Sequence, residues 1–481
     1  RFFVRAALSA RTSGRPALTF PGQLLQFRLG NLGGKMADFD IAVAGAGIVG
    51  VSTALWGQMR GKRVLLLDPA PPGTGTSAGN ACTLATYACM PVNDPSVFRN
   101  LPRLLAGRDS PLAFSLSHAV RNPRWMLSFL ANCRAAPSRR IAAALAGLLA
   151  QADAGLNPLI AEAAAEDLIV QRGQLSLWST AKAAEAATAG LDFRREHGVP
   201  FREVSPEDAK AMEPGLALPV ARAVHYTAAR QVRDPLELIR RLHARFAELG
   251  GETAAARVSA MRDTGTEVLL EAGPETFAAA HAVVACGAFS RSIEGAGTNL
   301  LPLGTERGYH LMFPSEGHRV SRPVGWDEGG FYAVPAANGL RLAGTVEIAA
   351  LHAQANEERL SYLARRGAEM LGPLPEPGSH WLGFRPTMPD ALPVIGRSPQ
   401  SERILHAFGH QHLGLTLGGI TGRIVTGLID GQPPGLDLAP FAPGRRFACP
   451  GRRPPGRLTL DFASHFRHQP GHRNTCGIGD E

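Results

Sequence analysis

The sequence is poor in cysteine, contains no long hydrophobic run and shows no excess of glycine and proline. Its six cysteines include no C-x-x-C pair and no zinc-finger spacing, which excludes a disulfide-stapled miniprotein and predicts no structural metal site. No uninterrupted apolar run reaches the ~18 residues of a membrane-spanning helix. Gly (54) and Pro (37) together stay below the ~25–30% typical of low-complexity chains. A chain of 481 residues therefore predicts two or three globular domains.

Acidic residues are absent from the first 35 positions, and this absence explains most of the net charge of +9. Residues 1–35 carry +6 and residues 448–481 carry +2, so the 36–447 body carries only +1. A nearly neutral body argues against a nucleic-acid partner, because phosphate binding requires an excess of Lys and Arg. We interpret both ends as extensions that are disordered or not native. For 1–35, a mitochondrial import sequence is the lesser alternative.

A glycine-rich turn follows the first apolar run of the body. Residues 41–44 (Ile-Ala-Val-Ala) are typical of a buried parallel strand, and glycines follow at G-x-G-x-x-G spacing. Gly45 permits a tight turn, Gly47 lets the backbone approach a pyrophosphate, and Gly50 allows close helix–strand packing. The helix predicted over 48–60 would direct free N–H groups at the phosphates. The predicted phosphate site comprises Gly45, Gly47, Ile48, Val49 and Gly50.

An acidic residue ends the next apolar run. Residues 63–67 read Arg-Val-Leu-Leu-Leu, and Asp68 follows 18 residues after Gly50. An acid near ~20 residues on, at the end of the second strand, accepts the ribose hydroxyls in dinucleotide folds. Asp68 therefore favours an unphosphorylated ribose, and hence FAD or NAD over NADP.

The loop after Asp68 indicates a flavin. Its segment 75–81, Gly-Thr-Ser-Ala-Gly-Asn-Ala, resembles the G-T-S-x-x-N-A segment of D-amino-acid dehydrogenases, which belong to the glycine oxidase and D-amino-acid oxidase flavoprotein superfamily. The resemblance implies that this loop lies along the pyrophosphate and flavin, with Thr76, Ser77 and Asn80 as cofactor contacts. The 69–80 loop contains no His that could tether the flavin, so non-covalent FAD is expected.

Two later segments agree with this resemblance. In the family, the backbone at the position of Val258 contacts the adenine, and we expect Val258 on a strand. The segment 281–290 is similar to the V-V-x-A-x-G-A motif, a buried strand and tight turn beside the cofactor, which implies Cys286 and Gly287 as contacts. Cys286 replaces the more common Ala, and we interpret it as a small buried residue rather than a redox thiol.

The most specific resemblance is the closing signature, G-x-R-P…P-D…P-x-I-G…G-H-x-x-x-G-x-T, which runs from residue 383 to residue 416. It implies a helix whose N-terminus, near Leu415, directs N–H groups at the flavin and stabilises negative charge on the reduced ring. The spacing of Ile424, Val425 and Leu428 predicts the closing helix over 421–429. The implied cofactor contacts are Gly409, Gly414, Leu415 and Thr416, with His410 as a neighbour of the flavin ring.

The substrate is implied by the same resemblance. Arg385 stands where glycine oxidase-like enzymes place a carboxylate-binding arginine, although a structural salt bridge is the alternative. Tyr309 could donate to the same carboxylate or pack in the core, and Tyr332 is a weaker candidate. The implied reaction is oxidation of the Cα–N bond of a D-amino acid, of D-proline or hydroxyproline type among others. Hydride passes to flavin N5, and the imine is hydrolysed to an oxo acid.

The order of the motifs predicts an α/β architecture. A Rossmann-like FAD-binding domain is expected from 36–90, 216–300 and 385–440, with an inserted α+β substrate domain, an antiparallel sheet plus helices, from 91–215 and 301–384. Residues 140–165, Ala-rich, are expected as helices of that insert.

The sequence motifs leave the electron acceptor and the cellular location open. A quinone, a dye-like carrier or O₂ could accept the electrons, so an oxidase or a demethylase of N-methylated amino acids on the same fold is the main alternative. A non-catalytic FAD-binding or nucleic-acid-associated protein is the alternative of a different class. We expect a cytoplasmic protein without an integral membrane segment, and peripheral association with the inner membrane stays open.

Overall fold

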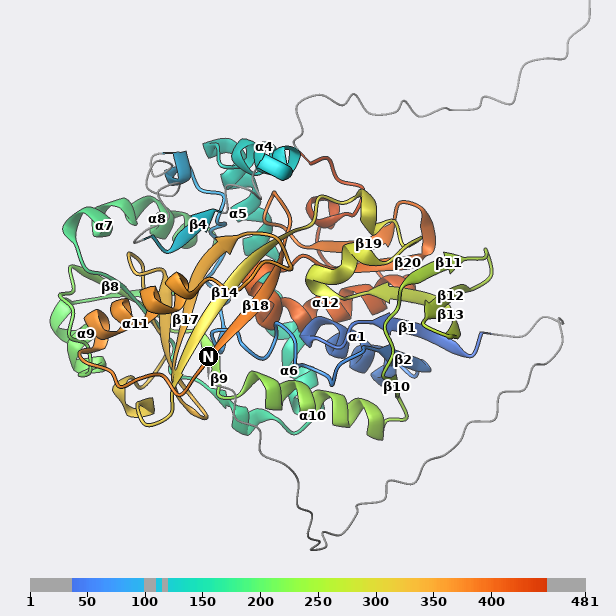
Figure 1. Cartoon of the computed structure of the whole chain (residues 1–481), viewed down its shortest axis with the longest axis horizontal. Helices are drawn as coiled ribbons and strands as arrows, with labels where there is room; N and C mark the ends of the chain where they lie inside the picture. Colours follow the sequence, from blue (N-terminus) through green and yellow to red (C-terminus); the bar gives the residue numbers. More distant parts are fainter. Residues whose placement is uncertain (1–36, 99–109, 115–119, 448–481) are drawn as a thin grey trace, which may run out of the picture. The chain divides into compact units, whose positions relative to one another are not determined.

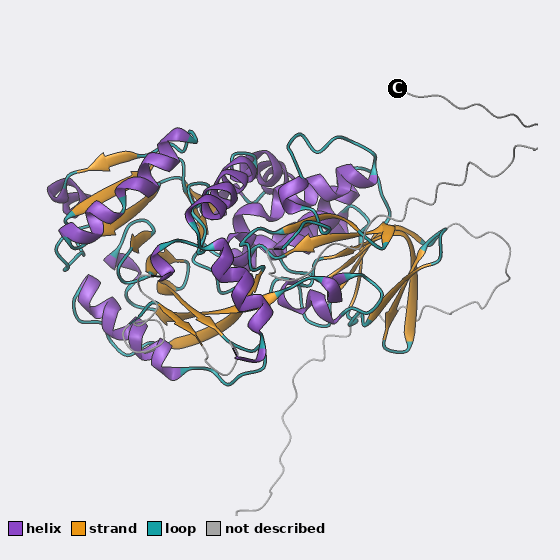
Figure 2. Ribbon diagram, turned by 90° about the horizontal axis from the view of Figure 1, so that it is seen from above, coloured by secondary structure: helices purple, strands orange, loops and turns teal. Residues whose placement is uncertain are grey.

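The computed structural model of the chain describes residues 37–98, 110–114 and 120–447. The predicted extensions 1–35 and 448–481 lie outside the described residues. In the described part, strands form an eight-stranded sheet, a nine-stranded sheet and a three-stranded sheet, with helices beside them (Figures 1 and 2).

The eight-stranded sheet carries the predicted dinucleotide-binding topology. β1 lies between β2 and β13 with parallel pairing on both sides, and β20 continues the parallel part beyond β13. All four residues of β2 are buried, as expected for a parallel strand covered on both faces. The first half of β13 pairs antiparallel with β12, and β12 with β11. The strands are β1 (Phe39–Ala44), β2 (Val64–Leu67), β10 (Glu252–Ala254), β11 (Ala260–Asp263), β12 (Val268–Ala272), β13 (Glu275–Val284), β19 (Val394–Ser398) and β20 (Ser401–Phe408).

The nine-stranded sheet is mostly antiparallel, which confirms the predicted α/β fold with a second α+β region. Its long strand β14 lies between β17 and β18 (Figure 1), and the helix α11 (Glu357–Leu371) packs against β14 and β17. The strands are β4 (Leu112–Phe114), β6 (Gln174–Trp178), β7 (Arg202–Val204), β8 (Arg222–Tyr226), β14 (Gly304–Phe313), β15 (Val324–Trp326), β16 (Phe331–Ala336), β17 (Gly339–Ile348) and β18 (Ser379–Thr387). The three-stranded sheet comprises β3 (Thr83–Leu84), β5 (Ile169–Val170) and β9 (Arg230–Val232).

The helices that follow the glycine-rich turn and the closing signature pack on each other. α1 (Ile48–Met59) contacts α12 (Gly414–Ile429), so the predicted closing helix starts seven residues earlier than Thr421. The remaining helices are α4 (Pro123–Asn132), α5 (Ala135–Leu149), α6 (Ala152–Glu162), α7 (Ala181–Ala186), α8 (Thr188–Glu196), α9 (Pro206–Met212) and α10 (Pro235–Glu248).

Two segments pack or pair outside the regions to which the sequence assigns them, and the domain boundaries stay a prediction. The Ala-rich helices α5 and α6, assigned to the substrate domain, share one apolar core with α1 and α12. Where α6 crosses α12, a Cβ added at Gly419 would lie 2.6 Å from the carbonyl oxygen of Gly155, so small residues permit this close packing. Conversely β8, within the 216–300 segment, pairs with β6 and β7 of the nine-stranded sheet. Helical periodicity predicts an apolar face but not the partner that covers it.

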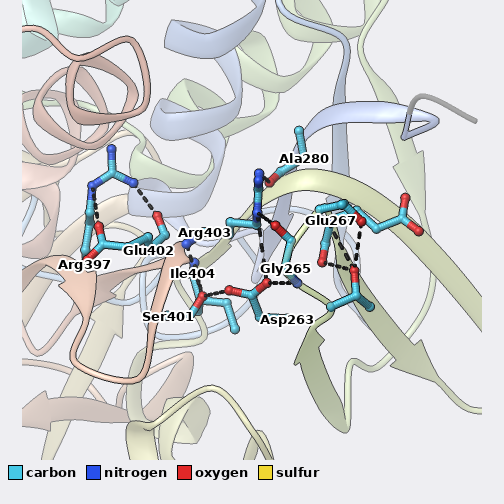
Figure 3. A network of polar contacts seen from close by, with 11 residues as sticks. Asp263, Gly265, Glu267, Ala280, Arg397, Ser401, Glu402, Arg403 and Ile404 are labelled. Atoms are coloured by element: carbon cyan, nitrogen blue, oxygen red, sulfur yellow. Dashed lines mark hydrogen bonds and ion pairs between the residues drawn. The ribbon is translucent and has the colours of Figure 1, made fainter. Parts of the chain in front are cut away.

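A polar network connects β20 with β13 and with the β11–β12 hairpin in the eight-stranded sheet (Figure 3). Ser401 Oγ donates to Asp263 Oδ2 at 2.5 Å, and Arg403 donates to the carbonyl oxygens of Gly265 (3.1 Å) and Ala280 (3.3 Å). These bonds join β20 to the β11–β12 hairpin. A surface hollow of about 570 Å³ lies here, and its polar side chains largely bond one another and the backbone. We therefore interpret it as structural.

Candidate active site

A cavity of about 550 Å³ is lined by residues of both large sheets. This volume falls within the range of about 300–1,000 Å³ of small-molecule and cofactor sites. Of the residues predicted from the sequence, the cavity is lined by Gly45, Gly47, Ile48, Val49, Asp68, Thr76, Ser77, Asn80, Val258, Cys286, Gly287, Tyr309, Arg385, His410, Gly414 and Leu415. Gly50, Gly409 and Thr416 do not line it.

The glycine-rich turn forms one end of the cavity because side chains do not fit there. Gly45 has φ +104°, and a Cβ on it would lie 2.5 Å from the carbonyl oxygen of Ala285. A Cβ on Gly50 would lie 1.7 Å from the carbonyl oxygen of Gly45, so Gly50 supports the turn from behind, as its predicted packing role requires. The turn thus holds the N-terminus of α1 at the cavity wall, where Gly47 and Ile48 expose backbone to a ligand.

Asp68 and the loop after it are fixed by hydrogen bonds. The carboxylate of Asp68 accepts from the backbone N–H of Ala46 (2.8 Å) and of Ala70 (2.9 Å), which leaves lone pairs for ribose hydroxyls. Ser77 Oγ accepts from the N–H of Ile48 at 3.1 Å, and thereby joins the loop to the start of α1. Asn80 Nδ2 donates to the carbonyl oxygen of Ser77 at 2.6 Å.

Thr76 links this loop to the strand that carries Arg385. Its hydroxyl donates to the carbonyl oxygen of Phe384 at 2.9 Å and accepts from the Phe384 N–H at 3.3 Å. The dinucleotide loop and the candidate substrate arginine are therefore held in fixed register by one side chain.

Two further predicted contacts, Val258 and Cys286, line the cavity. Val258, expected on a strand, lies in the connection between β10 and β11 and still lines the cavity. Burial raises the pKa of the Cys286 thiol to about 12, with a smaller contribution from Asp68, so the thiol stays protonated at neutral pH. Such a thiol is unsuited to redox chemistry, because the thiolate is the reactive form.

The N-terminus of α12 faces the same cavity. Gly414 and Leu415 line it, and the free N–H groups of this 16-residue helix present positive potential there. Thr416 instead accepts a hydrogen bond from the N–H of Ala85 at 2.9 Å and fixes the helix to the loop beyond β3. His410 Nε2 lies 2.8 Å from Thr421 Oγ1, and burial lowers the pKa of His410 to about 3. His410 is therefore neutral at neutral pH.

Arg385 extends from β18 across the neighbouring strand β14. A Cβ added at Gly308 would lie 2.4 Å from Nη2 of Arg385, so the guanidinium uses the space that a side chain would fill. Nη1 donates to the carbonyl oxygen of Thr345 at 3.1 Å, and this is the side chain's one hydrogen bond within the described residues. Burial lowers the pKa of Arg385 and Glu306 opposes that effect, but guanidinium stays charged. Arg385 thus has donors free for an anion in the cavity.

The Tyr309 hydroxyl bonds protein groups, which favours the core-packing alternative. The hydroxyl donates to Glu347 Oε2 at 2.6 Å and accepts from the N–H of Asn356 at 3.0 Å, and the ring belongs to the core under α11. Tyr309 borders the cavity, as its neighbour Gly308 does, but its hydroxyl is held by Glu347 and Asn356. Core packing, the alternative reading, describes Tyr309 better.

Two aromatic residues of the cavity, Tyr87 and Trp381, carry no sequence motif that predicts their place there. Tyr332, the weaker substrate-site candidate from the sequence, lines the cavity together with Tyr87. Their hydroxyl oxygens lie 3.4 Å apart. Trp381 stacks on His310 with ring centroids 5.2 Å apart, and a Cβ at Gly79 would lie 2.3 Å from its indole. Gly79 indicates in the sequence that something approaches the dinucleotide loop closely, but it does not identify Trp381 as the side chain that does so.

The fold and the cavity together define a dinucleotide-dependent oxidoreductase of the flavoprotein type. The residues fit FAD: the cradle at Gly45 and Gly47 admits a pyrophosphate, Asp68 suits a ribose, and the α12 N-terminus suits an electron-rich ring. A sequence model described as "FAD dependent oxidoreductase" (DAO) matches residues 40–428. The chain belongs to this family and uses FAD as its cofactor.

Known proteins match over most of their lengths. The chain is 33% identical to a D-amino-acid oxidase of Bradyrhizobium diazoefficiens over 84% of this chain and 98% of that protein. It is 29% identical to D-amino acid dehydrogenase 2 of Ralstonia nicotianae, over 84% and 100%. Glycine oxidase from Geobacillus kaustophilus has the same fold, with a TM-score of 0.67, 22% identity, and coverage of 85% of this chain and 100% of that chain.

Among the helices of residues 37–98 and 120–447, none combines the length and the apolar character needed to cross a bilayer.

Proposed function

We propose that the protein oxidises the Cα–N bond of a D-amino acid. The observation that carries this proposal is Arg385, a guanidinium with free donors beside the cavity that fits FAD. Relatives named D-amino-acid oxidase and D-amino acid dehydrogenase support the substrate class. A guanidinium fork matches a carboxylate with two parallel hydrogen bonds, and the α-carboxylate is common to all amino acids.

The residues of the chain hold and orient the substrate. Arg385 binds the carboxylate, and the cavity walls at Tyr87, Tyr332 and Val346 enclose the side chain. When bound, FAD supplies the redox chemistry by accepting the two electrons as a hydride. The substrate loses its Cα hydride and one N–H proton and becomes an imine. Water then hydrolyses the imine to an oxo acid and ammonia, whereas D-proline or a hydroxyproline would give a cyclic imine.

Of the described residues that line the cavity, Asp68 is the one carboxylate, and it lies at the dinucleotide end. His410 is neutral and its Nε2 is hydrogen-bonded to Thr421, so it serves as a wall of the cavity rather than as a proton acceptor. The substrate is therefore expected to react with its amine unprotonated, and the proton leaves to solvent.

A panel of amino acids tests this function. The FAD-loaded protein is mixed without oxygen with D- and L-amino acids, including proline and hydroxyproline, and the flavin absorbance is followed. We expect D-amino acids to bleach the flavin and their L-enantiomers to leave it oxidised. Reduction by L-enantiomers alone, or by no amino acid, would contradict the proposal.

The electron acceptor separates two variants of this function. A quinone or dye-like carrier makes the protein a dehydrogenase, and O₂ makes it an oxidase; relatives carry both names. Parallel assays with a dye and with O₂ distinguish them. A cytoplasmic location, with or without peripheral association with the inner membrane, stays a prediction.

Replacing Tyr309 with phenylalanine should leave substrate affinity unchanged. Because the hydroxyl bonds Glu347 and Asn356 rather than the cavity, its loss should cost about 1–3 kcal/mol of stability, as a lower Tm, with KM within about twofold of wild type. Tyr362→Phe, which removes another buried hydroxyl, bonded to the carbonyl oxygen of Gly329, is the matched control. A tenfold rise in KM for Tyr309→Phe alone would return Tyr309 to the substrate site.

A further inference from the structure

Glu306 is a buried carboxylate that the proposed reaction does not use. It lies on β14 with 1% of its surface exposed, behind the cavity wall. Its Oε1 lies 3.5 Å from Nε2 of Gln411, and its Oε2 has no hydrogen-bond partner within the described residues. A buried carboxylate with so few partners is costly when ionised, so its presence requires an explanation.

The strand register places Glu306 beside Arg385. The two residues are directly opposite each other in the antiparallel β14–β18 pair, so both side chains project from the same face of the sheet. The guanidinium leans over Gly308, two residues further along β14. Within the described part of the chain the two groups form no ion pair at or below 4.0 Å, and the arginine keeps donors free for a ligand.

Few other charges act on Glu306. His410, which is bridged to Thr387 of β18, is neutral because burial lowers its pKa to about 3. His412 faces the cavity, and enclosure by protein atoms together with Arg385 lowers its pKa to about 4. On the opposite face of β14, Arg307 and Glu347 neutralise each other at 3.1 Å.

Arg385 is therefore the charge that governs Glu306. Burial raises the pKa of Glu306 to about 7, and the opposing effects of Arg385 and of the Thr387 hydroxyl are smaller. A second anion bound to Arg385 would offset the cation that helps Glu306 to ionise, and would raise this pKa further.

We propose that Glu306 is a positioning residue that couples carboxylate binding at Arg385 to the uptake of one proton by its own side chain. The proposal rests on the proposed function in taking the ligand of Arg385 to be a carboxylate. The proton comes from solvent and forms the O–H bond of the Glu306 carboxylic acid, with no redox change. The uptake keeps one net negative charge, that of the ligand, opposite the guanidinium.

The direction of the pH dependence follows from linkage. At pH 5.5 Glu306 is already protonated in the free protein, so binding takes up almost no proton. At pH 7 the free group is about half protonated, so binding takes up about half a proton. Above pH 7 Glu306 is mostly ionised in the free protein, so carboxylate binding must first protonate it. The Kd of the carboxylate should therefore rise by up to about tenfold per pH unit.

The test uses the FAD-loaded protein and propionate, a carboxylate without an amine to oxidise. Titration calorimetry at pH 7 in two buffers of different ionisation enthalpy gives the number of protons taken up. We expect about half a proton for wild type and none for Glu306→Gln, whose Kd should no longer change between pH 6 and 8. Glu402→Gln, at an exposed glutamate, is the matched control and should behave as wild type.

The outcomes separate this proposal from the proposed function. Propionate binding by wild type without proton uptake between pH 6 and 8 would overturn the role of Glu306, whatever the folding of the variant. Uptake that persists in Glu306→Gln would do the same, and in both cases carboxylate recognition by Arg385 stands. Failure of wild type to bind propionate at any pH would overturn both.

Discussion

Replacement of Arg385 with leucine is expected to raise the KM for D-amino acids at least about 30-fold while the protein keeps its FAD. Losing one partner of an enclosed charge pair costs about 2–5 kcal/mol, and each 1.4 kcal/mol is tenfold in affinity. FAD should remain because the glycine-rich turn, Asp68 and Ser77 are untouched. Steady-state kinetics gives KM, and the flavin absorbance per protein after desalting gives FAD content.

The controls for this variant isolate the guanidinium. Arg139→Leu removes an arginine at the surface, paired with Glu196 at 3.8 Å, and should change neither quantity. Arg385→Lys keeps the charge but loses the planar fork, and should fall between wild type and leucine. A KM that stays normal in Arg385→Leu would show that the carboxylate binds elsewhere.

Replacement of Gly50 with alanine is expected to abolish FAD binding and to lower Tm. The added Cβ would lie 1.7 Å from the carbonyl oxygen of Gly45 and 3.5 Å from the Ala285 side chain. Because the nearer contact is backbone, α1 must move away from the turn, and the overpacking costs about 3 kcal/mol or more. The displaced helix N-terminus would no longer meet the pyrophosphate.

This expectation can be checked by FAD content and thermal unfolding. Gly147→Ala in α5, where an added Cβ has no neighbour within 4 Å, should retain FAD and unfold at or slightly above the wild-type temperature. A Gly50→Ala protein that retains stoichiometric FAD would contradict the close packing of turn and helix.

The dinucleotide site was predictable because its signals are local. The strand, the glycines and Asp68 lie within 28 residues, and each has a backbone reason for its position. The hydrogen bonds of the Tyr309 hydroxyl were not predictable, because they depend on the pairing of β14 with β17, where a register irregularity occurs between Arg307 and Tyr309. No pattern within one segment gives that pairing.

Contacts between residues that are far apart in the sequence could not be predicted from the sequence. Tyr87 and Tyr332 are 245 positions apart in the sequence, yet their hydroxyl oxygens lie 3.4 Å apart at the cavity wall. Glu306 carries no motif, and its place opposite Arg385 depends on the register of two strands. The apolar faces of α5 and α6 were predictable, but their packing against α1 and α12 was not.

The crossing of α6 and α12 at Gly155 and Gly419 has a consequence for how this enzyme could diversify. Trp56 of α1 also donates to the carbonyl oxygen of Gly155 at 3.0 Å, so three helices meet at one point. The region that contains α6 therefore cannot be exchanged for the equivalent region of a relative without regard to this contact. A recombination event that replaced it would have to supply a matching small residue at this point, or it would displace the helix whose first turn borders the cavity.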